Sequence, residues 1–132
     1  MSDLAELISA SGMRLTQPRL ALAELLFGDG KNRHVTADQL VEQLETSDTR
    51  IAQATVYNTL NRFVRAGLLR QIAGTGNGVS IFDTNTEPHH HFLNESTGKL
   101  TDIPLENLPL KHLPNPPDGE TIIACEIVIK TR

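Results

Sequence analysis

The segment from residue 52 to residue 66 constrains the fold more than any other part of the sequence. Its apolar residues recur every three or four positions, which is the period of a helix with one buried face. The buried stripe consists of Val56, Leu60, Phe63 and Val64. The opposite face carries hydroxyl, amide and guanidinium side chains and no carboxylate. We therefore predict an amphipathic helix whose exposed face favours contact with a polyanion.

A β-hairpin is predicted directly after this helix. Gly67 ends the helix, and two strand-like runs, 68–73 and 79–83, flank the glycine-rich segment 74–78. A nucleotide-binding glycine loop would have to connect a strand to a helix, whereas this segment lies between two strands. The hairpin is therefore the favoured interpretation.

Further helices are predicted before residue 52. A short leading helix ends near Gly12, and Thr16 then caps an apolar helix with Pro18 in its first turn. A capping box begins at Thr36 and opens the next helix, whereas Ala52 is a weak cap for the helix described above. A core of three helices followed by a hairpin is the order of a winged-helix domain, whose third helix enters the major groove of DNA.

The character of the sequence changes after Thr84, where most of the prolines lie. Strands are predicted over 89–94 and 99–103, and an alternation of apolar and polar residues predicts a last strand over 120–130. Cys125 falls on the apolar face of that strand, so we expect it to be a small buried hydrophobe. A segment this short buries little core alone, so self-association is expected.

The expected fold class is α+β with two domains. Residues 1–84 form a winged-helix DNA-binding domain, with a three-helix core and a β-hairpin wing. Residues 85–132 form a small α/β domain for dimerisation and for metal or haem sensing. One cysteine cannot form an internal disulfide, and neither a signal peptide nor a membrane segment is predicted, so we expect a cytoplasmic protein.

The charges are distributed unevenly along a chain whose net charge is −4. No Asp or Glu lies within 49–82 or within 8–23, and both stretches contain arginines. This separation predicts a DNA-facing surface on an otherwise acidic protein. The candidate DNA-binding residues are Arg14, Arg19, Thr55, Tyr57, Asn58, Asn61, Arg62 and Arg65.

Three consecutive histidines carry the most specific chemistry in the sequence. On the predicted strand, His89 and His91 point to one face and His90 points to the other. Nitrogen and carboxylate donors in this arrangement suit Fe²⁺, Mn²⁺ or Zn²⁺. The candidate metal ligands are His34, Asp83, His89, His91 and Asp102. His90 is a candidate for a second site or for axial ligation of haem, and the haem candidates are His89, His90 and His91.

Two other functions remain open from the residues alone. His89, His91 and one aspartate match the donor set of a non-haem iron enzyme, but such centres normally lie inside a β-barrel that this half-helical sequence does not predict. The other alternative is a winged-helix interaction module without any ligand. No pattern for nucleophilic catalysis is present, so we do not expect an enzyme.

Four motifs resemble those of the ferric uptake regulator (Fur) superfamily, in order and over nearly the whole chain. They are Gly-Met-Arg-Leu-Thr-Gln-Pro-Arg at 12–19, His-Val-Thr-Ala-Asp-Gln-Leu at 34–40, Ala-Thr-Val-Tyr-Asn-Thr-Leu at 54–60 and Ala-Gly-Leu-Leu at 66–69. Residues 81–86, the three histidines and residues 101–104 are similar to the iron response regulator (Irr) branch of alphaproteobacteria.

The resemblance implies roles for individual residues. It implies a regulatory metal site at His34, Asp83, His89 and His91, with Asp102 as an additional carboxylate. Arg14 would enter the minor groove and Tyr57 would lie on the recognition helix. In the Irr branch, the histidine cluster is also associated with haem.

The sequence departs from the family pattern at three positions. Asn94 and Thr97 stand where many members have a Cys-x-x-Cys pair, so no structural four-cysteine zinc site is expected. Asn58 stands where an arginine often follows the tyrosine, which puts the operator sequence in doubt. The expected function is a homodimeric regulator of iron or haem homeostasis genes, binding an operator in double-stranded DNA under the control of Fe²⁺, Mn²⁺ or haem. Zn²⁺ is expected as an ion acquired on purification.

Overall fold

The computed structural model describes residues 3–47, 49–72 and 79–132. These residues form two compact units, Met1–Thr86 and Glu87–Arg132, and each unit is described by itself. Among the helices of the described residues, none is long and apolar enough to cross a membrane.

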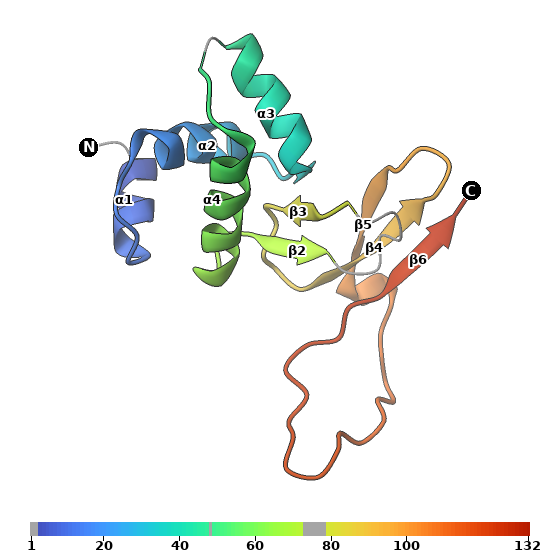
Figure 1. The fold of residues 1–132 in the computed structure, drawn as a ribbon. Helices are drawn as coiled ribbons and strands as arrows, with labels where there is room; N and C mark the ends of the chain where they lie inside the picture. Colours follow the sequence, from blue (N-terminus) through green and yellow to red (C-terminus); the bar gives the residue numbers. More distant parts are fainter. Residues whose placement is uncertain (1–2, 48, 73–78) are drawn as a thin grey trace. The chain divides into compact units, whose positions relative to one another are not determined.

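The first unit contains all four α-helices of the described residues (Figure 1). They are α1 (Asp3–Ala10), α2 (Gln17–Phe27), α3 (Ala37–Thr46) and α4 (Gln53–Arg65). Thr16 caps α2 by accepting a hydrogen bond from the Arg19 backbone N–H, at 3.3 Å. Thr36 and Gln39 form the predicted capping box at the start of α3. As expected, Ala52 makes no side-chain hydrogen bond to the start of α4.

A three-stranded sheet completes the first unit, in the order β1-β3-β2. Strand β1 (His34–Val35) pairs with β3 (Ile81–Asp83), and β3 also pairs with β2 (Arg70–Ile72), both in antiparallel fashion. The pairing of β2 with β3 confirms the two arms of the predicted hairpin. The predicted turn at 74–78 lies outside the described residues.

The hydrophobic core of the first unit is formed by the helices and by the sheet. Helix α4 is the third helix of the winged-helix order. Three residues of its predicted apolar stripe are fully buried: Val56, Leu60 and Phe63. Leu22 and Leu26 of α2 lie in the same core, so the core fixes α2 against α4. The expected three-helix core with a hairpin is thereby confirmed.

The second unit is built on a sheet with the order β5-β4-β6. Strand β4 (His89–Asn94) pairs antiparallel with β5 (Leu100–Pro104) and parallel with β6 (Val128–Thr131). A 3₁₀ turn, η1 (Leu105–Asn107), follows β5. The buried apolar side chains of the second unit are Leu93, Leu100 and Ile103, so this unit has a small core of its own.

The predicted last strand over 120–130 is mostly wrong. Only Val128–Thr131 is a strand, and residues 108–127 form a long segment without helix or strand (Figure 1). Cys125 is exposed and Ile123 is 95% exposed, so the predicted burial of the cysteine is also wrong. The alternation of apolar residues is real, but within its own unit the segment has no surface against which to bury them.

Candidate metal centre and nucleic-acid interface

The first unit contributes one histidine and one aspartate to the candidate metal ligands. His34 and Asp83 are register partners on β1 and β3, and His34 Nε2 lies 3.3 Å from Asp83 Oδ2. Asp83 is completely buried, and its Oδ1 accepts a hydrogen bond from the Asn85 backbone N–H at 2.8 Å. A buried carboxylate needs a compensating partner. The backbone therefore orients one oxygen while the other faces the imidazole.

The second unit contributes two histidines and one aspartate. Strand alternation places His89 and His91 on one face of β4, and Asp102 is the register partner of His91 on β5. Asp102 Oδ1 lies 3.4 Å from His89 Nε2 and 3.3 Å from His91 Nε2. Both imidazoles are buried, and their ring centroids are 4.5 Å apart. A single carboxylate oxygen thus faces two imidazole nitrogens.

The hydrogen bond of His89 determines which of its nitrogens carries the proton. His89 Nδ1 lies 2.5 Å from the Glu87 carbonyl oxygen, which can only accept, so Nδ1 is the donor. In the neutral ring, Nε2 then presents a lone pair towards Asp102 Oδ1. Two electron-rich atoms at this distance need a cation or an additional proton between them. Imidazole nitrogens with carboxylate oxygens are the ligands that Fe²⁺, Mn²⁺ and Zn²⁺ accept, so the residues fit a divalent transition metal.

His90 is held differently from its neighbours. It is 1% exposed, and its Nδ1 accepts a hydrogen bond from the Ile127 backbone N–H at 3.0 Å. The proton of the neutral ring is therefore on Nε2, which is buried and has no hydrogen-bond partner among the residues described. Ligation of a metal or of haem through Nε2 would move the proton to Nδ1 and break the bond to Ile127.

The eight candidate DNA-binding residues do not all lie together. Arg19 on α2 and Thr55, Asn58 and Arg62 on α4 line one hollow of about 280 Å³, together with Thr16, Pro18 and Thr59. Tyr57 is half-buried against the core, whereas Asn61 and Arg65 are exposed on α4 outside the hollow. Arg14 is exposed before α2, and Arg19 Nη1 donates a 2.7 Å hydrogen bond to its carbonyl oxygen. The structure therefore brings four of the candidates together, and Arg19 braces a fifth.

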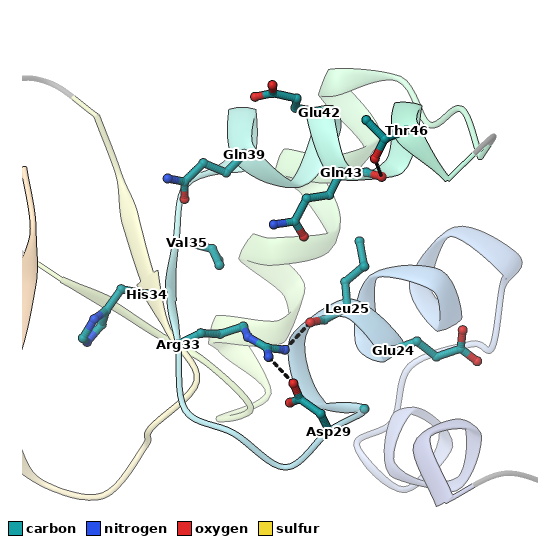
Figure 2. Close-up of a pocket in the computed structure, with 11 residues that line it drawn as sticks. Glu24, Leu25, Asp29, Arg33, His34, Val35, Gln39, Glu42, Gln43 and Thr46 are labelled. Carbon is teal, nitrogen blue, oxygen red and sulfur yellow. Dashed lines mark hydrogen bonds and ion pairs between the residues drawn. The ribbon is translucent and has the colours of Figure 1, made fainter.

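Sequence reasoning missed Arg33, which binds the end of α2 and lies beside His34. Figure 2 shows this arginine in a cleft between the end of α2, β1 and one side of α3. The volume of the cleft is about 940 Å³. The Arg33 guanidinium donates to the carbonyl oxygens of Leu25 and Leu26 and to Asp29. One weak signal was available: α2 has no basic residue in its last turn, and a basic residue shortly after a helix can complement its C-terminal end.

Comparison with known proteins identifies the family. The model of the "Ferric uptake regulator family" matches residues 10–112. The chain is 33% identical over 103 residues to the "Peroxide operon regulator" of Bacillus subtilis, covering 78% of this chain and 69% of that protein. It is also 33% identical to the "Peroxide-responsive repressor PerR" of Staphylococcus aureus over 70% of this chain, and the match spans 61% of that repressor's length.

Solved structures of low sequence identity show the same fold. The ferric uptake regulator of Pseudomonas aeruginosa with manganese superposes with a TM-score of 0.74 at 20% identity, covering 99% of this chain and 98% of that one. The ferric uptake regulator of Francisella tularensis with iron gives 0.72 at 20% identity, covering 92% of each chain. Because the family model covers most of the sequence and relatives reach 33% identity, the chain belongs to the ferric uptake regulator family.

Proposed function

We propose that this protein is a metal-responsive transcription regulator, a homodimer that binds an operator in double-stranded DNA with an affinity set by a divalent cation. The observation that carries the proposal is Asp102 Oδ1, which faces two imidazole nitrogens at 3.3 and 3.4 Å. The names of the relatives, a regulator and a repressor, support the regulatory role. Because the family consists of transcription regulators and not of enzymes, we set the non-haem iron enzyme aside.

We propose that the two halves of the ligand set act on one cation. His34 and Asp83 belong to the first unit, and His89, His91 and Asp102 belong to the second. Only residues 84–88 separate Asp83 from His89 in the sequence. A cation that both halves bind would favour one arrangement of the two units over all others. Differential binding of this kind is what lets a ligand change DNA affinity.

Fe²⁺, Mn²⁺ and Zn²⁺ are the cations that the proposal admits. When bound, such an ion supplies the positive charge that the facing lone pairs and carboxylates lack. Manganese and iron are the metals named for the solved relatives, which supports this choice. More specifically, we propose that the protein regulates iron homeostasis genes, as the similarity to the Irr branch implies.

Haem is the weaker candidate for the signal. The two solved relatives described above are named with manganese and with iron, and the hydrogen bond from Ile127 to His90 Nδ1 opposes ligation of haem through His90 Nε2. Binding of haem at His90 would cost that bond and the attachment of residue 127 to β4. A divalent cation at His89 and His91 requires no such rearrangement, so we favour it.

The DNA-binding half of the proposal rests on α4 and on the start of α2. Arg19, Thr55, Asn58 and Arg62 line one hollow, and their side chains are of the types that bind phosphates and base edges. Tyr57, Asn61, Arg65 and Arg14 complete the proposed surface. A regulator of this kind acts where the DNA is, so we place it in the cytoplasm.

The proposal also includes a dimer, because apolar side chains remain uncovered in the second unit. Ile122 and Ile123 are 43% and 95% exposed, and Leu105, Leu110 and Leu113 are exposed as well. A unit with so small a core gains stability by burying such residues against a second copy.

The experiment that tests the proposed function measures DNA binding of the metal-free protein and of the same protein with Mn²⁺. The DNA is first selected from a random duplex library by the Mn²⁺-loaded protein. We expect Mn²⁺ to tighten binding to the selected DNA and not to an unrelated duplex, and we expect replacement of both His89 and His91 by Ala to abolish that effect. Failure to enrich any sequence, or an unchanged Mn²⁺ effect in the double variant, would contradict the proposal.

A further inference from the structure

Arg33 connects the strand that carries His34 to the far end of α2. Its Nη1 donates to the carbonyl oxygens of Leu25 and of Leu26, the latter at 3.1 Å, and its Nη2 donates to Asp29 Oδ2 at 2.5 Å. The last carbonyls of a helix lack intrahelical partners and favour a nearby cation. Because α2 has no basic residue in its last turn, Arg33 supplies that cation from outside the helix.

The backbone of Arg33 is tied to the opposite strand of the ligand pair. Its N–H donates to Thr84 Oγ1 at 2.9 Å, and its carbonyl oxygen accepts from the Thr84 N–H at 3.1 Å. Thr84 directly follows Asp83, which pairs with His34. One residue therefore holds both strands of the His34–Asp83 pair to the end of α2.

The side chains of Arg33 and His34 point to opposite sides of their segment (Figure 2). His34 points towards β3, whereas Arg33 points towards α2 and Asp29. The backbone N–H of Lys31 and the Arg33 guanidinium lower the pKa of Asp29, so this carboxylate is ionised and bound to Arg33 at neutral pH. The backbone of this segment therefore joins the His34 contact with Asp83 on one side to the Arg33 contacts on the other.

Helix α2 leads from these contacts to the proposed DNA-binding surface. Its first turn begins at Thr16 and contains Arg19, which holds the carbonyl oxygen of Arg14. The helix also packs against α4. A rigid helix of this kind transmits a movement of its C-terminal end to its N-terminal end.

We propose that Arg33 is a positioning residue that transmits metal binding at His34 and Asp83 to α2, and through α2 to the DNA-binding surface. This inference rests on the proposed function. Both side chains of the Arg33–Asp29 pair are partly exposed, at 26% and 48%, and such pairs add little to stability. The ion pair with Asp29 therefore orients the guanidinium of Arg33 against the Leu25 and Leu26 carbonyl oxygens.

The test compares operator affinity with and without Mn²⁺ in wild type, Arg33→Gln, Arg33→Lys and Asp29→Asn. The control is Lys31→Gln, which removes a cation from the same loop while leaving the backbone N–H that binds Asp29. Couplings between two sites are typically about 5- to 150-fold in affinity, so we expect the Mn²⁺ effect of wild type and of Lys31→Gln to lie in this range. In Arg33→Gln, the ratio of operator affinity with Mn²⁺ to operator affinity without Mn²⁺ should fall to within about twofold of one. The Mn²⁺ affinity without DNA should change little.

Arg33→Lys keeps the charge but cannot bridge two carbonyls and a carboxylate as the planar guanidinium does, so it should give an intermediate ratio. Asp29→Asn should also reduce the ratio. If both Arg33 variants kept the wild-type ratio, even with a lower melting temperature, Arg33 would only cap α2. The inference would then be wrong, and the proposed function would stand. A ratio of one in wild type itself would overturn the proposed function.

Discussion

Single residues determine the chemistry of the candidate metal centre, and Asp102 is the most informative of them. Its carboxylate faces His89 and His91 Nε2, and the bond from His89 to the Glu87 carbonyl leaves a lone pair on His89 Nε2. A cation or an additional proton between these atoms would make the arrangement favourable. The donor atoms of the centre are therefore already directed towards one another before a cation binds.

Replacement of Asp102 by Asn tests this interpretation. The amide nitrogen can donate to an imidazole lone pair, so we expect the metal-free variant to melt at a higher temperature than the metal-free wild type. Metal at a hundredfold excess over its dissociation constant stabilises a protein by about 2.7 kcal/mol, and the variant should lose most of that gain with Mn²⁺. Thermal unfolding in EDTA and in Mn²⁺ measures both effects. A variant that Mn²⁺ stabilises as strongly as wild type would show that Asp102 is not a ligand.

The residue types of this centre could be predicted from the sequence, but their protonation could not. Strand alternation alone places His89 and His91 on one face and His90 on the other. The bond from Ile127 to His90 depends on the parallel pairing of β6 with β4, a long-range register that no local pattern contains. The contacts of Arg33 escaped for a different reason: the lack of a basic residue at the end of α2 does not identify which residue complements that end.

The helical elements follow their local sequence signals closely. Thr16 and Thr36 cap their helices as predicted, and Ala52 precedes α4 without any side-chain cap. The predicted last strand failed because alternation signals a strand only where a second surface covers the apolar face. Local rules therefore described α2, α3 and α4 well and the segment before β6 poorly.

Two substitutions at helix starts test whether the capping residues contribute to the stability of their helices. Ala52→Ser adds an oxygen that can accept from the free N–H groups of α4, and we expect it to raise the free energy of unfolding by about 0.5–1 kcal/mol. Thr36→Ala removes half of the capping box of α3 and should lower it by about 1 kcal/mol. Urea denaturation followed by circular dichroism measures both. If Ala52→Ser destabilised the protein, the start of α4 would need a different account.

At the scale of the whole molecule, several apolar side chains of residues 105–123 are exposed, and Ile123 is 95% exposed. Association of two copies would remove such side chains from water, which favours the dimer. We therefore expect the protein to be a dimer in solution, with Ile123 among the buried residues of the interface.

Replacement of Ile123 by Asp should weaken the dimer, because it places a charge in an apolar interface. We expect the dimer dissociation constant to rise at least about tenfold, equivalent to about 1.4 kcal/mol. Asn115→Asp adds the same charge at another exposed position of this segment and should have no such effect. Sedimentation velocity over a concentration series measures both variants. Equal dissociation constants in the two variants would place the interface elsewhere.

The central claim is that cation binding and DNA binding are coupled in one protein, and thermodynamic linkage tests it most directly. Titrations should determine operator affinity with and without Mn²⁺, and Mn²⁺ affinity with and without operator. The account predicts that both affinities change by the same factor, of at least about fivefold. It also predicts that the factor becomes one when His89 and His91 are both replaced by Ala. A factor of one in the wild-type protein would contradict the account.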